Sequence, residues 1–304
     1  MKKNVLISGG SGFVGSHLTD LLLSKGYTVS ILSRSKKQNK KDIFYYKWDV
    51  ATQFIEEDAV LKADYIIHLA GENIADKRWT AKRKAAIIDS REKSSQLLYM
   101  VLKKHYKKLD AFISASAVGY YGAVNGEEIC TEEDAPANDF LGYACQKWED
   151  SIDFIENLNI RTVKIRTGLV MGKNDGFLKK LIPLFKYRLG AALGNGKQYM
   201  PWIHIDDLCE MYYHALVNEQ MSGPYNAAIN DNTANTIFSK TLARLFGYSI
   251  WLPNVPAFIL KMTLGEMSKI VLTGRRVSVD KIEQTGFKFK YKKLEEALRN
   301  CLPA

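Results

Sequence analysis

Cysteine and histidine are scarce in this sequence, which has four of the first and five of the second among 304 residues. The cysteines, at positions 130, 145, 209 and 301, have no paired spacing. This is typical of reduced thiols and argues against a disulfide framework. Neither residue type recurs at the spacing of metal ligands, so we expect no bound metal. The use of cysteine predicts a cytoplasmic protein.

Long apolar runs are also missing. The apolar start of the chain resembles a secretory signal only superficially, because Gly9, Gly10 and Gly12 interrupt it. The most apolar later segment, residues 255–274, contains charged side chains that a bilayer span would not tolerate. We therefore expect a soluble protein with no membrane partner.

Acidic residues are in the minority. The chain has 43 lysines and arginines against 33 aspartates and glutamates, so its formal net charge is 43 − 33 = +10. That balance suits an anionic ligand. The lysines are scattered and no nucleic-acid motif accompanies them, so we expect no nucleic-acid partner.

The most informative feature that is present is a glycine-rich turn between an apolar strand and a helix. Residues 5–8 are strand-like, and the glycines that follow form a G-x-x-G-x-x-G pattern that opens an amphipathic helix. Glycine permits the tight turn, lets the backbone approach a pyrophosphate and lets the helix pack closely on the strand. Free N–H groups and the positive end of the helix dipole would face the phosphates. We predict dinucleotide binding by Gly9, Gly10, Ser11, Gly12, Phe13, Val14 and Gly15.

The end of the second predicted strand, residues 28–32, indicates which dinucleotide. Proteins that select NAD place an acidic side chain here to accept from the ribose 2′-hydroxyl. This sequence has Ser33 and Arg34 instead. A guanidinium and a hydroxyl would hold a 2′-phosphate that a carboxylate would repel. We therefore predict NADP rather than NAD.

Strand-like runs alternate with helical patterns through the first half of the chain. This order predicts an α/β fold with a Rossmann-type doubly wound parallel sheet. Later residues predict a smaller, mostly helical C-terminal lobe. We place an NADP-binding domain at 1–172 and the lobe at 173–304, with 203–228 returning to pack on the first domain. The substrate would lie between them, outside the carboxyl ends of the strands.

Further motifs follow the glycine turn along nearly the whole chain. They comprise residues 68–71, 116 with 120–122, 166–172 and 204–207. Together they resemble the extended short-chain dehydrogenase/reductase superfamily, which includes nucleotide-sugar epimerases and dehydratases. The resemblance implies hydride chemistry on a small molecule with a hydroxyl or carbonyl group, such as a nucleotide sugar.

A narrower set of motifs resembles the NADP-binding, epimerase-like subfamily that has its own C-terminal domain. It comprises residues 69–74, 77–79, 89–91, 116–122, 139–141, 147–149, 264–267 and 286–289. This resemblance implies coenzyme contacts from the glycine turn and from Ser33, Arg34, Leu69, Ala70, Gly71, Arg91 and Val170. Relatives often pair through their two long helices, so a homodimer is one open alternative for the oligomeric state.

The superfamily uses a serine or threonine, a tyrosine, and a lysine four residues after the tyrosine. Ser116 at a predicted strand end, with Tyr143 and Lys147 downstream, matches this set. A spacing of four places the tyrosine and lysine on one helical face. The lysine ammonium would lower the tyrosine pKa and make it a usable acid or base. We predict these three residues as catalytic.

Another register of the same helix is also open. The superfamily often has a glutamate four residues after the lysine. If Glu149 is that glutamate, the lysine position falls on Cys145 and the tyrosine position on Leu141. A two-residue shift turns a side chain roughly 200° around the helix. Tyr120 or Tyr121 is then an alternative proton donor.

Two functions follow from these patterns. The first is an NADP-dependent oxidoreductase or epimerase-like enzyme, and the second is an NADP(H)-binding regulatory protein with little or no turnover. The departure from the expected catalytic register motivates the second.

Overall fold

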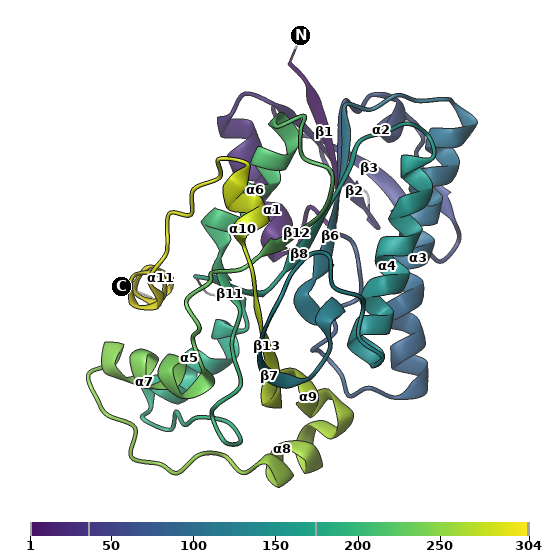
Figure 1. Ribbon diagram of the computed structural model, residues 1–304. Coiled ribbons are helices and arrows are strands. Elements are labelled where there is room, and N and C mark those ends of the chain that lie inside the picture. Colours follow the sequence, from purple (N-terminus) through teal and green to yellow (C-terminus); the bar gives the residue numbers. More distant parts are fainter. Residues whose placement is uncertain (1, 36, 174, 303–304) are drawn as a thin grey trace.

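A computed structural model describes residues 2–35, 37–173 and 175–302. Among these residues the largest sheet has eight strands in the order β12-β8-β6-β5-β1-β2-β3-β4 (Figure 1). Neighbouring strands are parallel except β3 and β4. The strands span Gly223–Ala227 (β12), Thr162–Thr167 (β8), Ala111–Ala117 (β6), Tyr65–His68 (β5), Asn4–Ser8 (β1), Thr28–Ser33 (β2), Ile43–Asp49 (β3) and Phe54–Ile55 (β4). The prediction of a doubly wound parallel sheet is confirmed.

Helices cover both faces of this sheet. On one face lie α1 (Phe13–Ser24) and α6 (Ile205–Val217), and on the other α3 (Ala81–Lys104) and α4 (Phe140–Glu156) (Figure 1). Successive side chains of a strand point to opposite faces. In β1, Val5 and Ile7 therefore join the core beneath α1 and α6, whereas Leu6 joins the core beneath α3 and α4. The alternation gives the protein two hydrophobic cores, one on each side of the sheet.

The remaining elements are shorter. A second sheet has the order β10-β9-β11, and β13 pairs with β7 in a third. The bounds of these strands are Leu169–Gly172 (β9), Asp175–Gly176 (β10), Trp202–His204 (β11), Asn125–Cys130 (β7) and Gly274–Val277 (β13). The other helices are α2 (Asp58–Leu61), η1 (Val118–Tyr121), α5 (Leu178–Lys186), α7 (Asn235–Leu245), α8 (Ala257–Leu264), η2 (Gly265–Ser268), α9 (Lys269–Leu272), α10 (Asp280–Gln284) and α11 (Leu294–Cys301).

Polar side chains mark where the two long helices begin. The Thr80 hydroxyl accepts from the Arg83 N–H at the start of α3, and the Asp139 carboxylate accepts from the Gly142 N–H at the start of α4. Such capping satisfies N–H groups that have no partner within the helix. The pair of helices therefore starts at defined points beside the carboxyl edge of the sheet.

The strand-like segment 161–170 is divided in the structure. Its first part is β8 in the large sheet, and its second part is β9 in the three-stranded sheet. Gly168 separates them, because a Cβ there would lie 2.0 Å from the Pro201 carbonyl oxygen. Only glycine leaves room for the chain to pass from one sheet to the other. Pro201 is distant in sequence, so the local pattern could not show this break.

Three further findings concern membrane-spanning helices, cysteines and metal ligands among the described residues. No helix among them is both long and apolar enough to cross a bilayer. All four cysteines are free and buried. Within these same residues no group of three or more His, Cys, Asp or Glu side chains is placed to hold a metal ion.

The first prediction concerns Gly168. Replacing Gly168 with alanine should lower the free energy of unfolding by about 1–3 kcal/mol, because the new methyl group must displace the Pro201 backbone. Gly126→Ala is the control, since nothing lies within 4 Å of a Cβ at that position. We expect the control to change stability by less than about 0.5 kcal/mol in urea denaturation. Equal stability of the two variants would contradict this explanation of the strand break.

Candidate functional site

The glycine turn joins β1 to α1 and packs directly against the end of β5. Gly9 has φ +75°, and a Cβ there would lie 3.0 Å from the Leu69 carbonyl carbon and 3.1 Å from the Ala70 nitrogen. A Cβ at Gly15 would lie 2.4 Å from the Gly9 carbonyl oxygen. These close backbone contacts are the reason that the turn needs glycine. They bring Leu69 and Ala70, both predicted coenzyme contacts, beside the turn.

The first turn of α1 is open to a ligand. Gly12 is its N-cap, has no side chain to cap the helix, and is exposed. The first turn contains no acidic residue. N–H groups at a helix start have no acceptor within the helix, and the helix dipole adds positive potential there. Phe13 and Val14, which are half-buried, lie in this turn, and Ser11 beside it is exposed. The cradle thus fits the diphosphate of a dinucleotide.

His68 at the end of β5 joins the glycine turn to helix α3. Its Nδ1 lies 2.6 Å from the Ser8 hydroxyl, which also accepts from the N–H groups of Leu69 and Ala70. On the other side, its Nε2 lies 3.1 Å from the Ser94 hydroxyl and 3.2 Å from that of Ser95. Complete burial lowers the pKa of His68 to about 3, so the ring is neutral. His68 therefore has a positioning role in this site.

Arg91 lies on the same turn of α3 and approaches the end of β5. Both serine hydroxyls that contact His68 donate to the Arg91 carbonyl oxygen. A Cβ at Gly71 would lie 3.2 Å from the Arg91 guanidinium carbon. The network thus places this guanidinium next to the segment that follows β5.

The Arg91 guanidinium has only neutral partners among the described residues. It donates to the carbonyl oxygens of Glu72 (3.1 Å) and Ile87 (2.9 Å), and it lies 4.6 Å from the centroid of the Trp148 ring. Burial lowers the pKa of Arg91 from its usual value. The guanidinium makes no direct ion pair within the described residues, although the Glu72 carboxylate is near enough to counteract part of this lowering of the pKa. A half-buried cation of this kind is stabilised by a bound anion. An anion at the glycine turn would provide a direct ion pair.

Ser33 and Arg34 lie at the end of β2, the strand beside β1. Ser33 is half-buried and Arg34 is exposed. The pKa of Glu72 is lowered, chiefly by the hydrogen bond from Arg83 and further by the charges of Arg34 and Lys77. Arg34 therefore lies close enough to the segment after β5 to influence its charge. The structure brings this predicted contact to the same edge as the glycine turn.

Val170 lies in β9, where it pairs with Ile203 of β11. It is half-buried, and its carbonyl oxygen would be 2.8 Å from a Cβ at Gly176. The Phe13 ring packs against Gly172 at the end of the same strand. Val170 thus lies on the strand that contacts the start of α1.

Ser116 lies at the end of β6 and is held in a buried polar network. Its hydroxyl donates to Glu149 Oε1 at 2.6 Å, and Arg166 contacts both oxygens of that carboxylate at 2.9 and 2.8 Å. Ser116 is only 3% exposed. With its hydroxyl committed to a carboxylate inside an ion pair, this serine is poorly placed to contact a substrate.

The structure does not bring Tyr143 and Lys147 to Ser116. Tyr143 is 49% exposed, and Lys147 Nζ lies 5.7 Å from the centroid of its ring. Glu149, the partner of Ser116, is two residues beyond Lys147 and so lies roughly 200° around α4 from it. The predicted catalytic roles of these residues thus lack a common site. The physical reason is the face of the helix: Trp148 and Ile152 are buried in the core, which turns Tyr143 outward.

The face of α4 that is turned toward the end of β6 contains Leu141 and Cys145, the tyrosine and lysine positions of the alternative register. Cys145 Sγ and Leu141 Cβ would each lie 3.5 Å from a Cβ at Gly119 in η1. Burial raises the pKa of Cys145 to about 12, so the thiol stays protonated at neutral pH. The positions that correspond to tyrosine and lysine in this register therefore hold no group suited to acid–base chemistry.

The alternative donors, Tyr120 and Tyr121, both pack against Arg166. The Tyr121 hydroxyl donates to Asn226 Oδ1 at 2.7 Å and accepts from Arg166 at 3.0 Å. The Arg166 guanidinium carbon lies 3.5 Å from the centroid of the Tyr120 ring. Burial raises the pKa of both tyrosines, which makes each a weaker acid near neutrality.

Sequence reasoning missed the residues that organise this network. Glu149 served only as part of a family motif and as the marker of the alternative helix register, Arg166 lay only inside a motif, and Asn226 was not singled out. Burial identifies Glu149 and Arg166 once the structure is known, since charged residues are rarely buried unless they are paired. No local spacing links Ser116 to a glutamate 33 residues away.

Comparison with known proteins places this geometry in a family. The model of the NAD dependent epimerase/dehydratase family matches residues 5–228. A second model, a domain of unknown function named DUF1731, matches residues 255–301. Among curated relatives, the epimerase family protein YfhF of Bacillus subtilis is 37% identical over 301 residues and covers 98% of each chain. The epimerase family protein SAR0825 of Staphylococcus aureus is 33% identical over 303 residues and covers 99% of each chain.

The fold is also similar to solved structures of epimerases and epimerase family proteins. The human epimerase family protein SDR39U1, crystallised with NADPH, has a TM-score of 0.86 and 26% identity over 98% of each chain. A nucleoside-diphosphate sugar epimerase from Corynebacterium glutamicum has a TM-score of 0.80 and 30% identity. That alignment covers 99% of this chain and 58% of the other.

The second prediction concerns pH. Folded His68 has a pKa of about 3 against 6.5 in an unfolded chain, so the unfolded state binds more protons between these values. Stability contributed by His68 is therefore present above pH 6.5 and is lost as the pH falls, by at most about 1.4 kcal/mol per pH unit. His68→Gln should show a shallower decline between pH 6.5 and 5 in urea denaturation. The exposed His17, changed to glutamine, is the control, and parallel curves for wild type and His68→Gln would refute the assignment.

Proposed function

The chain belongs to the NAD-dependent epimerase/dehydratase family, and on that premise we propose that it binds NADP(H) and exchanges a hydride with a small hydroxyl- or carbonyl-bearing molecule. The glycine turn would bind the diphosphate through the N–H groups at the start of α1. When bound, the nicotinamide ring supplies or accepts the hydride. The side chains and backbone of the protein would bind and orient the coenzyme, and the helix start and Arg91 would neutralise its phosphates.

The observation that carries the proposal is that the Arg91 guanidinium, within the described residues, makes hydrogen bonds to carbonyl oxygens and no ion pair. Burial of a guanidinium among carbonyl oxygens and an indole ring is unfavourable unless a negative group joins it. Its neighbour Gly71 follows the strand that contacts the glycine turn. A diphosphate held by the turn would provide this negative group within the same site.

The choice of NADP over NAD rests on Arg34. It is exposed just past β2, where a 2′-phosphate on the adenosine would lie, and the two residues after β2 include no carboxylate. Arginine binds a phosphate with two N–H groups in a fixed geometry. The presence of NADPH in the human SDR39U1 structure supports the same choice for this relative of similar fold.

The third prediction tests the coenzyme. Arg34→Gln should weaken NADPH binding by about 10- to 100-fold, because a charge-assisted hydrogen bond contributes about 1.5–3 kcal/mol. NADH binding should change by less than about twofold, since NADH has no 2′-phosphate. Lys37→Gln, the same charge change at an exposed lysine three residues further on, is the control. Calorimetry measures the affinity of the wild type and of both variants for each coenzyme, and equal affinity of the wild type for NADPH and NADH would refute the NADP assignment.

A second candidate function is a binding protein that uses NADP(H) occupancy as a signal and turns over little or nothing. The observation that favours it is the composition of the α4 face beside β6, which carries Leu141 and the protonated thiol of Cys145. Hydride transfer to a carbonyl also requires a proton for the oxygen. Cys145, Tyr120 and Tyr121, which lie beside this face, have raised pKa values, and the Glu149 carboxylate on the same face is paired with Arg166.

The fourth prediction separates these possibilities. If Tyr143 were the general acid, Tyr143→Phe would lower turnover by about 10²- to 10⁴-fold. Because Tyr143 is half exposed and has no hydrogen bond to Ser116, we expect turnover and NADPH affinity to stay within about twofold of wild type. NADPH absorbance with a panel of aldehydes and ketones measures this, with Tyr106→Phe in an exposed turn as control.

Loss of turnover in Tyr143→Phe alone would restore the predicted catalytic pair. A wild-type protein that binds NADPH tightly and consumes none with any compound of the panel would favour the binding function.

A further inference from the structure

The C-terminal lobe exposes large apolar side chains around helix α8. Six of the eight residues of this helix are apolar, and none of the eight is buried. Phe258 is 68% exposed and Met262, about one turn later, is 70% exposed. Trp251, which precedes the helix, is 68% exposed. Exposed apolar side chains that lie close together mark sites of interaction with another protein or with a membrane.

Further exposed apolar side chains lie at the end of α5, which is joined to the segment before α8. Trp251 Nε1 donates to the Arg188 carbonyl oxygen at 3.0 Å, and the Val255 N–H donates to the Ala192 carbonyl oxygen at 2.8 Å. Figure 1 shows α5 and α8 at the same end of the molecule, opposite the N-terminus. We call the exposed apolar side chains of these joined segments the lobe patch: Leu184, Tyr187, Leu189, Trp251, Phe258 and Met262.

The lobe patch belongs to two stretches of the chain that contain no acidic residue. Residues 176–205 and 232–265 have eight lysines and arginines and no aspartate or glutamate, so they hold most of the net charge of +10. Lys186 and Arg188 flank Tyr187, and Lys261 precedes Met262. These three basic side chains are exposed, and none of them is in an ion pair within the described residues. The apolar patch is therefore bordered by positive charge alone.

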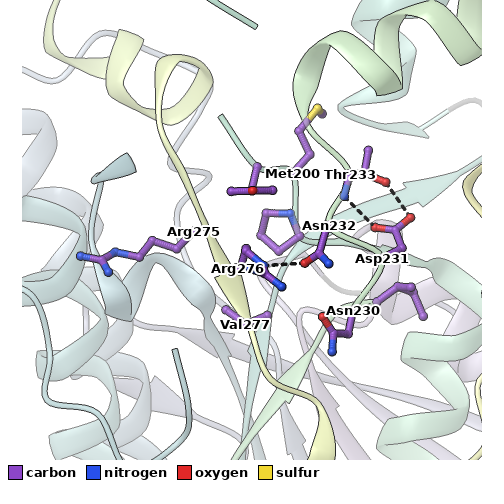
Figure 2. Close-up of a pocket in the computed structure, with 11 residues that line it drawn as sticks. Met200, Asn230, Asp231, Asn232, Thr233, Arg275, Arg276 and Val277 are labelled. Atoms are coloured by element: carbon purple, nitrogen blue, oxygen red, sulfur yellow. Dashed lines mark hydrogen bonds between the residues drawn. The ribbon is translucent and has the colours of Figure 1, made fainter. Parts of the chain in front are cut away.

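Two further arginines of the lobe, both on β13, have partners elsewhere. Figure 2 shows Arg276 directed toward Asn232, and its Nε donates to Asn232 Oδ1 at 2.5 Å. Its Nη1 donates to the Glu127 carbonyl oxygen at 3.2 Å. Arg275 extends away from this group in Figure 2 and is paired with the Glu128 carboxylate at 3.2 Å. The positive charge beside the lobe patch therefore comes from α5 and α8 rather than from β13.

Helix α8 is held by its polar end, which leaves its apolar side chains exposed. Arg78 donates to the Thr263 carbonyl oxygen at 2.7 Å and also to that of Met262. Such bonds satisfy carbonyl groups that have no partner at the end of a helix. Lys84 of α3 is paired with Glu266, just after α8, at 2.6 Å. Because these contacts fix the helix in place, the lobe patch is preformed and can bind at a lower entropic cost.

The chemistry of the lobe patch favours a lipid surface over a protein. Interfaces between folded proteins contain paired charges and hydrogen bonds that fix the register of the two partners. A second copy of this chain would bring like charges together. An anionic bilayer matches the patch better. Tryptophan, phenylalanine and leucine enter the boundary between headgroups and acyl chains, while lysine and arginine extend their charges to the headgroups.

We propose that the lobe patch docks on the surface of a membrane that contains anionic lipids, without crossing it. The charges that exclude residues 255–274 from the interior of a bilayer are compatible with its surface. The expectation of no membrane partner considered only segments that span a membrane, and this proposal replaces it. The docking goes beyond the proposed function and does not depend on coenzyme binding.

The fifth prediction tests this docking by co-sedimentation of the full chain with lipid vesicles. Vesicles of phosphatidylcholine that also contain phosphatidylserine should bind the wild type at least about tenfold more tightly than vesicles of phosphatidylcholine alone. Salt should weaken this binding, because it screens the charges. The double variants Phe258→Ser/Met262→Ser and Lys186→Gln/Lys261→Gln should each weaken it by about tenfold or more, the first through lost apolar burial and the second through lost charge.

Matched controls make the same changes at exposed positions away from the lobe. Phe154→Ser/Met100→Ser alters the same residue types on α4 and α3, and Lys41→Gln/Lys108→Gln removes the same charge. Both controls should bind vesicles within about twofold of the wild type. Urea denaturation monitors folding, and Phe258→Ser alone replaces the double variant if that is unstable.

Weaker binding of both lobe-patch variants, with both controls unchanged, supports the docking. Absence of binding by the wild type to vesicles with phosphatidylserine overturns it, as does equal weakening in variants and controls. Weakening in the lysine variant without weakening in the apolar variant also overturns it, because the attraction would then be that of any basic protein. Sedimentation velocity without lipid tests a second copy as the occupant. A wild-type dimer that Phe258→Ser/Met262→Ser abolishes would overturn the docking too.

Discussion

The ion pair between Glu149 and Arg166 holds together the elements at the end of β6. The pair is buried. Its carboxylate accepts a hydrogen bond from the Ser116 hydroxyl, and its guanidinium donates one to the Tyr121 hydroxyl. Four elements meet there: β6, α4, β8 and η1. A pair buried in this way stabilises the fold only when its remaining hydrogen-bond positions are filled, and here neighbours from each element fill them. The same contacts occupy the Ser116 hydroxyl.

Three arginines along the carboxyl edge of the sheet show how one side chain is used in two ways. Arg166, in the middle, is neutralised by Glu149. Arg91 and Arg276, toward the two ends, contact only neutral oxygens and aromatic rings within the described residues. A buried or half-buried cation tends to acquire a partner, because its desolvation is otherwise uncompensated. The edge therefore has one arginine held in an ion pair between two that, within the described residues, make none.

The parts of this arrangement that the sequence predicted are those that local spacing determines. The glycine turn follows from three glycines at fixed intervals between a strand and a helix, and β2 ends at Ser33, one residue beyond the predicted strand 28–32. The break at Gly168 depends on Pro201, and the hydrogen bond between Arg276 and Asn232 joins residues 44 positions apart. Contacts between segments this far apart leave no trace in hydrophobic periodicity. They could be found only once the strands were placed in order.

In helix α4, too, the sequence predicts local geometry but not the contacts with distant segments. A tyrosine and a lysine four residues apart do share one face of a helix, so the spacing rule itself was correct. Which face meets the site is decided by burial, and Trp148 and Ile152 turn that pair outward while Cys145 and Glu149 face β6. The proposed coenzyme site and the predicted catalytic residues thus lie in different parts of the fold. The first comprises the turn after β1 and Arg91, whereas the second lie on β6 and α4, where Ser116 is bound to Glu149 and Tyr143 is half exposed. Under the proposed function, coenzyme affinity therefore does not depend on which face of α4 meets β6.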